Sequence, residues 1–133
     1  MKALAQVMLV GLLALGACES PGEPKDPIWG KQACGACSML VSEPAHAAQL
    51  VTKEETRVYF DDVGCMAAYM IERNLNPPKM WVRDSAGKWV DARSAKFKSG
   101  AKTPMDFGYS YAADGDATFV DVQLAAKKRA ERR

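Results

Sequence analysis

The spacing of hydrophobic and polar residues changes along the chain, and each spacing predicts a different element. The stretches 47–52 and 56–60 have the pattern of half-buried strands, and the polar "KEE" between them predicts a hairpin. From Val63 onward the apolar residues recur at positions 63, 66, 67, 70 and 71, which is the spacing of an amphipathic helix. Asp61 or Asp62 is expected to cap the N-terminus of this helix.

The second half of the chain predicts more short elements. The segments "KMWV" and "KWVDA" flank the turn sequence "DSAG" and predict a second hairpin, and "SAKFKSG" alternates loosely. Asp116 is expected to cap a last helix that runs through the C-terminal residues. The mixture predicts an α+β fold, a small single domain of short antiparallel strands and about two helices. Two successive strand-strand-helix passages raise the hypothesis of an internal ββα-type duplication.

The N-terminus has the features of a secretory signal. Lys2 precedes an apolar run at 3–17, which is too short to span a bilayer. The run ends in "LGAC", which resembles the bacterial lipobox, in which the cysteine becomes the lipidated first residue of the mature protein. We therefore expect a lipoprotein signal peptide at 1–17, a lipidated N-terminus and tether at 18–30 and one domain at 31–133. An ordinary signal peptide that leaves Cys18 unmodified is the alternative.

Charge and composition narrow the function classes. The formal net charge is +2 at pH 7, and the basic segment "KKRAERR" is typical of a solvated helix end, so we expect no nucleic-acid partner. No Ser-His-Asp arrangement, Gly-rich phosphate loop or paired-carboxylate site stands out in the sequence. We therefore expect a protein that is not an enzyme.

The cysteines carry the main chemical signal. Apart from Cys18, the chain contains Cys34, Cys37 and Cys65, and three cysteines cannot all pair in an oxidising compartment. A disulfide between Cys34 and Cys37 would close a very small loop and stabilise little. A thioredoxin-like pair would need a strand before it and a helix after it, whereas a Pro/Gly-rich stretch precedes this pair and Pro44 follows it. An extracytoplasmic thiol-disulfide oxidoreductase stays open as an alternative function.

Metal binding explains the sulfur-rich segment better. Thiolates and thioethers are soft ligands that select monovalent copper, and "CGACSM" places two thiols and the thioether of Met39 within one short segment. The rival metal is zinc, because Cys34, Cys37, His46 and Cys65 would make a Cys₃His set. A zinc-stapled binding module is therefore a further alternative.

Three more residues are candidates for the metal shell. Cys65 lies in the first turn of the predicted helix, roughly opposite the apolar stripe, where the helix dipole favours a thiolate. Met66 follows it on the stripe and is expected in the core by default. Met105 lies in the polar, turn-rich "TPMDFG" segment, where it is either a thioether ligand or a loop anchor.

Several segments, taken in order, carry a family resemblance. A lipobox followed by "CGACSM", "VYFDDVGCMAAYM", "MWVRDSAGKWVDARSAKF" and "TPMDFGYSYA" resembles the NosL family, the copper-binding accessory lipoproteins of nitrous oxide reductase maturation. The resemblance covers nearly the whole mature domain. The family motif usually reads Cys-Gly-Met, and Ser38 replaces that glycine here.

The resemblance implies a small α+β domain that binds copper(I) through Cys and Met sulfur and hands it to a copper enzyme. We expect Cys34, Cys37, Met39 and Met105 as ligands, with Cys65, Met66 and His46 as further candidates. The implied partners are membrane lipid through Cys18 and the apo form of nitrous oxide reductase or its assembly factors. The implied location is the bacterial cell envelope, facing the periplasm.

Lipidation at Cys18 is a testable consequence of the "LGAC" sequence. Replacing the acceptor thiol in Cys18→Ala should leave an unprocessed or unlipidated precursor, which mass spectrometry of the membrane fraction would detect. The contrary result is a mature protein that begins with an unmodified Cys18 thiol.

Overall fold

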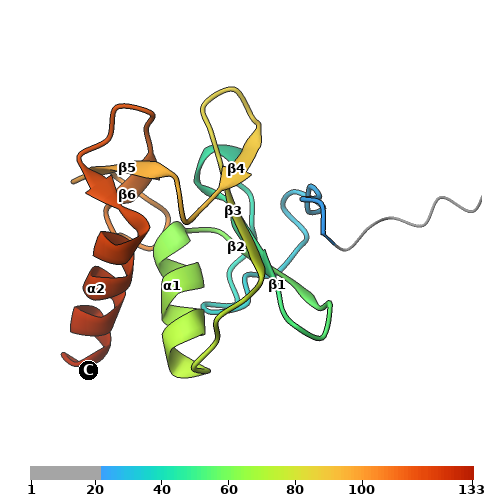
Figure 1. Cartoon of the computed structure of the whole chain (residues 1–133), viewed down its shortest axis with the longest axis horizontal. Coiled ribbons are helices and arrows are strands. Elements are labelled where there is room, and N and C mark those ends of the chain that lie inside the picture. The colour runs from blue at the N-terminus through green and yellow to red at the C-terminus, as the bar shows by residue number, and fades with distance from the viewer. Residues whose placement is uncertain (1–21) are drawn as a thin grey trace, which may run out of the picture.

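The computed structural model describes residues 22–133, in which two helices accompany two small antiparallel sheets (Figure 1). The expected signal peptide at 1–17 and the expected lipidation site, Cys18, lie outside the described residues. Within 22–133, no helix has the length and apolar character that a membrane crossing requires. The elements are η1, a 3-10 helix (Pro44–His46), β1 (Ala48–Val51), β2 (Arg57–Phe60), α1 (Val63–Glu72), β3 (Lys79–Arg83), β4 (Trp89–Asp91), β5 (Lys96–Ser99), β6 (Tyr109–Tyr111), β7 (Ala117–Thr118) and α2 (Phe119–Ala130).

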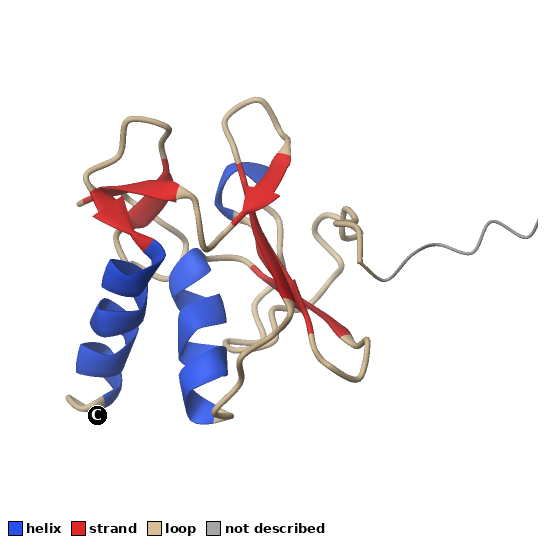
Figure 2. Cartoon of the chain, viewed as in Figure 1, coloured by secondary structure: helices blue, strands red, loops and turns tan. Residues whose placement is uncertain are grey.

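The α+β class is confirmed, and both expected hairpins are present. The first sheet has the order β2-β1-β3-β4, in which β1 pairs antiparallel with β2 and with β3, and β3 pairs antiparallel with β4. The second sheet has the order β6-β5-β7 and leads directly into α2 (Figure 2). Because the two sheets differ in strand number and order, an internal duplication stays a hypothesis.

Of the two aspartates before α1, Asp62 is the one that caps the helix. Its carboxylate accepts a hydrogen bond from the N–H of Gly64 at 2.9 Å, which satisfies one of the free donors at the helix N-terminus. The same carboxylate accepts a second bond, from the N–H of Met105 at 3.1 Å. Fully buried Asp62 therefore ties the start of α1 to a loop that lies far away in the sequence.

The cap of α2 differs from the expected one. Thr118 caps the helix in a capping box with Asp121, whereas Asp116 accepts hydrogen bonds from the N–H and the hydroxyl of Ser99. The helix begins later than predicted because Ala117 and Thr118 still pair with β5. The prediction of Asp116 as the cap was therefore wrong.

The hydrophobic core lies between the first sheet, α1 and α2. Alternate residues of the strands, such as Leu50 and Phe60, face α1, and Phe60 makes an edge contact with Tyr69 at a centroid distance of 5.3 Å. Met66 is fully buried in this core, as its place in the apolar stripe predicts. The two helices lie side by side (Figure 1), with Val122 of α2 buried in the same cluster.

The opposite face of the first sheet is covered by residues 23–29, named here the stem. The side-chain amide of Gln49 bonds the backbone of Lys25 in both directions, at 2.9 and 3.1 Å. Asp26 pairs with Arg83 at 3.2 Å and accepts the indole N–H of Trp89 at 2.7 Å. The later part of the segment expected as a tether thus packs on the domain, and the layers run stem, sheet, α1 and α2.

Candidate metal centre

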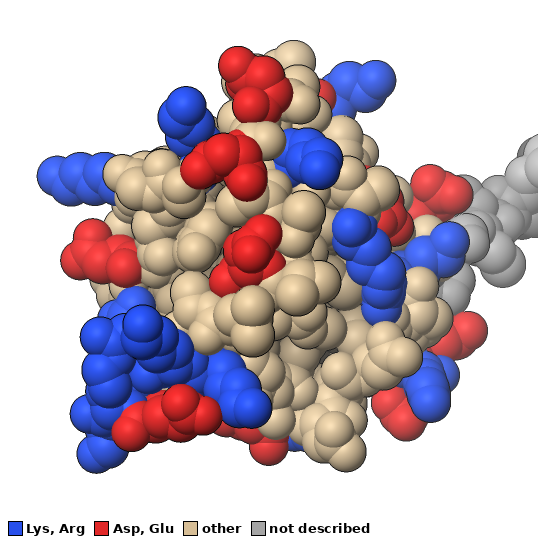
Figure 3. Space-filling view, turned by 60° about the vertical axis from the view of Figure 1, so that its left-hand side comes forward, with Lys and Arg blue, Asp and Glu red and all other residues tan. Residues whose placement is uncertain are grey.

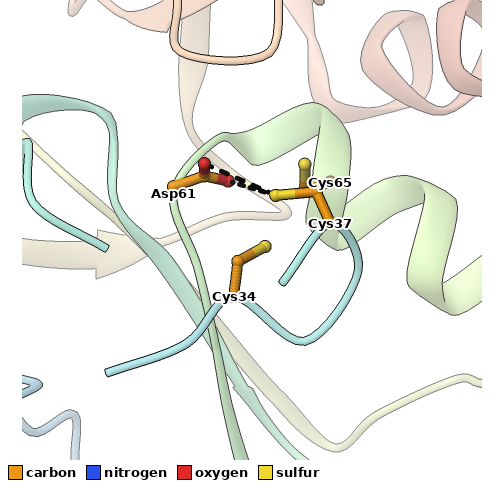
Figure 4. Close-up of side chains that lie close together, drawn as sticks. All are labelled: Cys34, Cys37, Asp61 and Cys65. Atoms are coloured by element: carbon orange, nitrogen blue, oxygen red, sulfur yellow. Dashed lines mark hydrogen bonds between the residues drawn. The ribbon is translucent and has the colours of Figure 1, made fainter. Parts of the chain in front are cut away.

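Four side chains with metal-ligating atoms meet between the N-terminal loop and the start of α1 (Figure 4). Cys34 and Cys37 come from the loop that follows the stem, Asp61 directly precedes the cap of α1, and Cys65 lies in its first turn. Their three sulfurs and a carboxylate oxygen all lie within 4.8 Å of one another. This is the only such group of His, Cys, Asp and Glu side chains found among residues 22–133.

Backbone hydrogen bonds shape the loop that carries two of the cysteines. The N–H of Cys34 donates to the carbonyl of Met39 at 2.7 Å, and the N–H of Gly35 donates to the carbonyl of Tyr59 on β2 at 2.8 Å. A Cβ at position 35 would collide with Val58, so only glycine lets the loop lie this close to the strand. Ser38 has φ +63°, the left-handed conformation that suits the glycine usual in the resembled family.

Asp61 is the member of the cluster that sequence reasoning missed. Two adjacent aspartates before a helix are explained by capping, yet one cap needs only one of them. Because Asp62 takes the cap, Asp61 is left to face the cysteines, where its carboxylate accepts the Cys37 thiol at 3.4 and 3.5 Å. The two-residue alternation of the preceding strand is the signal that could have placed neighbouring side chains on opposite sides.

The three thiols have different affinities for protons. The Cys65 thiol donates to the Cys34 sulfur, and this bond, with backbone N–H donors, lowers the pKa of Cys34 to about 6 against the effect of burial. The same bond and burial raise the pKa of Cys65. Burial is the main cause that raises the pKa of Cys37 to about 11. Near neutral pH the cluster therefore holds one thiolate, Cys34, and two thiols.

A pocket of about 80 Å³ gives access to the cluster from the side of α2. Cys37 and Cys65 line it together with Met105, so the fold brings the "TPMDFG" loop next to the cysteines. Cys34 does not line this pocket; Cys34 and Cys65 are both buried, whereas Cys37 is only partly buried. An ion that entered this pocket would meet Cys37, Cys65 and the Met105 thioether before Cys34.

The other candidates lie in different surroundings. Met39 leaves 53% of its surface exposed, and its carbonyl holds the N–H of Cys34. Met66 faces the core. His46 lies in η1, with its Nε2 at 3.9 Å from a carboxylate oxygen of Glu43, and is not part of the cluster. The structure therefore brings together the three cysteines with Asp61, places Met105 on the same pocket, and leaves His46 outside this group.

The donor set defines what the site can bind. Three sulfurs and one oxygen suit a soft monovalent ion on the sulfurs alone, or a tetrahedral zinc ion on all four donors. Hard cations such as Mg²⁺ and Ca²⁺ prefer several oxygens and find one carboxylate here. A metal in this site would therefore be copper(I) or zinc.

The geometry is unfavourable for thiol-disulfide exchange. That reaction needs an accessible thiolate. Here the thiolate, Cys34, is buried, whereas the more accessible Cys37 has a raised pKa and carries its proton. The two cysteines also lie in a turn rather than at the start of a helix. The arrangement suits a metal ligand better than an attacking nucleophile.

No protein-family model matches this sequence, and a search of curated proteins found no match. Among solved structures, the crystal structure of the copper chaperone NosL from Shewanella denitrificans has a similar fold, with a TM-score of 0.58. The two sequences are 18% identical over 82% of this chain and 89% of that chain. The resemblance to NosL is thus confirmed at the level of the fold.

The thiolate at Cys34 can be tested by ultraviolet absorbance of the reduced, metal-free mature protein with Cys18 replaced by Ser. Because its pKa is lowered to about 6 from 9.0, thiolate absorbance should rise by one group as pH increases through about 6. Cys65→Ala removes the thiol donor and should move this step up toward 9.0. Cys34→Ser should abolish it, and a single joint transition of all three thiols near 9.0 would contradict the assignment.

Proposed function

We propose that this protein is a lipid-anchored copper(I) chaperone that binds one copper ion at the three-cysteine centre and delivers it to a copper enzyme. The observation that carries the proposal is the convergence of Cys34, Cys37 and Cys65, from two distant segments, within 4.8 Å of one another. The similar fold belongs to a protein described as a copper chaperone, which supports the same function here. We propose no enzymatic activity.

Copper(I) fits the centre because its preferred ligands are soft and few. Three sulfurs from cysteine and the nearby Met105 thioether provide such ligands without an imidazole. Asp61 already places a negative charge beside Cys37, so a neutral thioether costs less electrostatic repulsion than a third thiolate. A mixed shell of thiolate and thioether is therefore the arrangement that we propose for the bound ion.

Zinc is the second candidate, and one observation favours it. Asp61 supplies a fourth donor, so the zinc set is Cys₃Asp rather than the expected Cys₃His. A structural zinc site is usually required for folding. The described domain has its own core of apolar residues around α1, so we prefer a transferable ion to a structural one.

Release requires that the ion can leave by a short path. The pocket beside Cys37 and Met105 provides that path, and the partly exposed Cys37 can exchange ligands with an acceptor first. A thioether is a weaker ligand than a thiolate and can detach without taking up a proton. These features suit a carrier rather than a permanent store.

The client and the location follow from the resemblance. We propose that Cys18 is lipidated, that the domain faces the periplasm, and that the receiving protein is nitrous oxide reductase or one of its assembly factors. The "LGAC" sequence and the ordered motifs support this proposal. The packed stem begins a few residues after Cys18, so an anchor there would hold the domain close to the membrane.

A copper(I) titration against a coloured competitor tests the metal centre in the Cys18→Ser mature protein. We expect one copper(I) per chain. Cys37→Ser, Cys34→Ser and Cys65→Ser should each lower the affinity by at least about tenfold, because each removes a soft ligand. The matched control, His46→Ala, should leave the affinity unchanged because His46 lies outside the cluster.

Titrations of the same Cys18→Ser protein with copper(I) and with zinc show which metal the centre prefers. Asp61→Asn removes a hard anionic donor, so zinc affinity should fall by a larger factor than copper(I) affinity. Wild-type copper affinity in the Cys34→Ser, Cys37→Ser double variant would place the site elsewhere. A protein that unfolds when chelated and refolds only with zinc would instead support a zinc-stapled module.

The thioethers provide a separate test. Met105→Leu and Met39→Leu keep the apolar volume nearly constant, so the free energy of unfolding should change by less than about 1.5 kcal/mol. Met105→Leu should weaken copper(I) binding because Met105 borders the cysteine pocket, and Met39→Leu should weaken it if its exposed side chain folds over the ion. Unchanged copper affinity in Met105→Leu would remove this thioether from the shell.

A further inference from the structure

A groove of about 740 Å³ runs along α2, beside the cysteine pocket. One wall is a single face of the helix and the other is the loop after Met105, with Phe107 and Tyr109. The apolar side chain of Leu124 points into it and leaves 59% of its surface exposed. The lining residues within α2 recur with i, i+3, i+4, i+7, i+8 spacing and are Asp121, Leu124, Ala125, Lys128 and Arg129; Arg132 and Arg133 line the groove just after the helix ends.

One end of this groove is strongly basic. Figure 3 shows Lys and Arg side chains gathered in one area at the lower left. Lys128, Arg129, Arg132 and Arg133 line the groove, and none of them forms an ion pair with a carboxylate of residues 22–133. The negative end of the helix dipole favours cations here. The helix dipole explains why this end of α2 tolerates several positive charges. It does not supply the negatively charged groups that these side chains could bind.

The groove and the cysteine pocket share a wall. Phe107, Arg129 and Arg133 line both hollows. The Arg129 guanidinium lies 4.3 Å from the centroid of the Phe107 ring and donates to the carbonyl of Met105 at 2.6 Å. A molecule that occupied the groove would therefore touch the residues that border the metal centre.

We propose that this groove docks an acidic segment of the protein that receives the metal. The proposal rests on the proposed function, because it assigns the docking surface for the same transfer. Carboxylates of the segment would pair with the basic end, and an apolar side chain would cover Leu124 and Phe107. The shared wall then holds the acceptor next to Cys37 and Met105, where the ion leaves.

The layer order favours a protein partner over a lipid surface. The stem covers the face of the first sheet opposite α1, through Lys25 on Gln49 and Asp26 on Trp89. The helix α2 lies on the far side of α1, so the groove and the stem are at opposite ends of the molecule (Figure 1). An anchor upstream of the stem would thus leave the groove facing away from the membrane.

The test uses fluorescence anisotropy of a fluorescein-labelled peptide of repeating Glu-Glu-Leu with the mature Cys18→Ser protein. Lys128→Glu with Arg132→Glu reverses two groove charges and leaves the cysteine pocket intact. The matched control is Lys127→Glu with Lys79→Glu, which makes the same charge change at exposed sites outside the groove. Circular dichroism checks folding, and Lys128→Gln with Arg132→Gln provides a milder variant.

We expect the groove variant to bind the peptide at least about tenfold more weakly than wild type, and the control variant less than about threefold more weakly. Binding should weaken as salt is added, and a Gln-Gln-Leu peptide should bind poorly. Equal binding by wild type and the groove variant, or no binding by wild type, would overturn the proposal. The proposal would also be overturned if binding to vesicles of equimolar phosphatidylglycerol and phosphatidylcholine depended on Lys128 and Arg132 while binding to the peptide did not.

Copper affinity separates this proposal from the proposed function. Neither Lys128 nor Arg132 lines the cysteine pocket, so copper(I) affinity should be unchanged in the groove variant. A wild-type protein that binds the peptide but no copper would refute the chaperone function and leave the docking surface standing. A protein that binds copper but not the peptide would refute the docking surface and leave the chaperone function standing.

Discussion

Asp62 makes the two hydrogen bonds on which the metal centre depends. Its carboxylate caps α1 through Gly64 and holds the backbone of Met105, so one buried side chain fixes the helix start and the distant loop. The cap orients the first turn of α1, which carries Cys65 toward the cysteine loop. It also leaves Asp61 free to accept the Cys37 thiol. The centre is therefore assembled by the same contact that joins the two halves of the fold.

The protonation of the cluster then determines how it handles a cation. The Cys65 thiol stabilises the Cys34 thiolate, so Cys34 is charged while Cys37 and Cys65, which line the pocket, keep their protons. Binding at Cys34 needs no proton release near neutral pH, whereas each further thiolate would add negative charge beside Asp61. The Met105 thioether, which lines the pocket, is neutral and can act as a ligand without adding negative charge. The centre thus combines one cysteine that is already charged with protonated cysteines and a neutral thioether along the exit.

Local patterns predicted the elements, but long-range contacts decided what they became. Alternation and helical spacing located β1 to β4 and α1, because these depend on neighbouring residues. The start of α2 was misplaced because Thr118 pairs with β5, a partner that local sequence does not reveal. Asp61 was assigned to capping, and His46 was grouped with the cysteines, for the same reason. Neither the contact of Asp62 with Met105 nor the packed stem has a local signature.

The most direct test of the account is X-ray absorption spectroscopy at the copper edge of the copper(I)-loaded mature Cys18→Ser protein. If the ion is held by the cysteines with thioether support, the first shell will consist of sulfur and will lose sulfur in Cys34→Ser. It will also lack the outer-shell scattering of an imidazole, since His46 lies outside the cluster. A first shell dominated by nitrogen or oxygen, or one with clear imidazole scattering, would contradict the assignment.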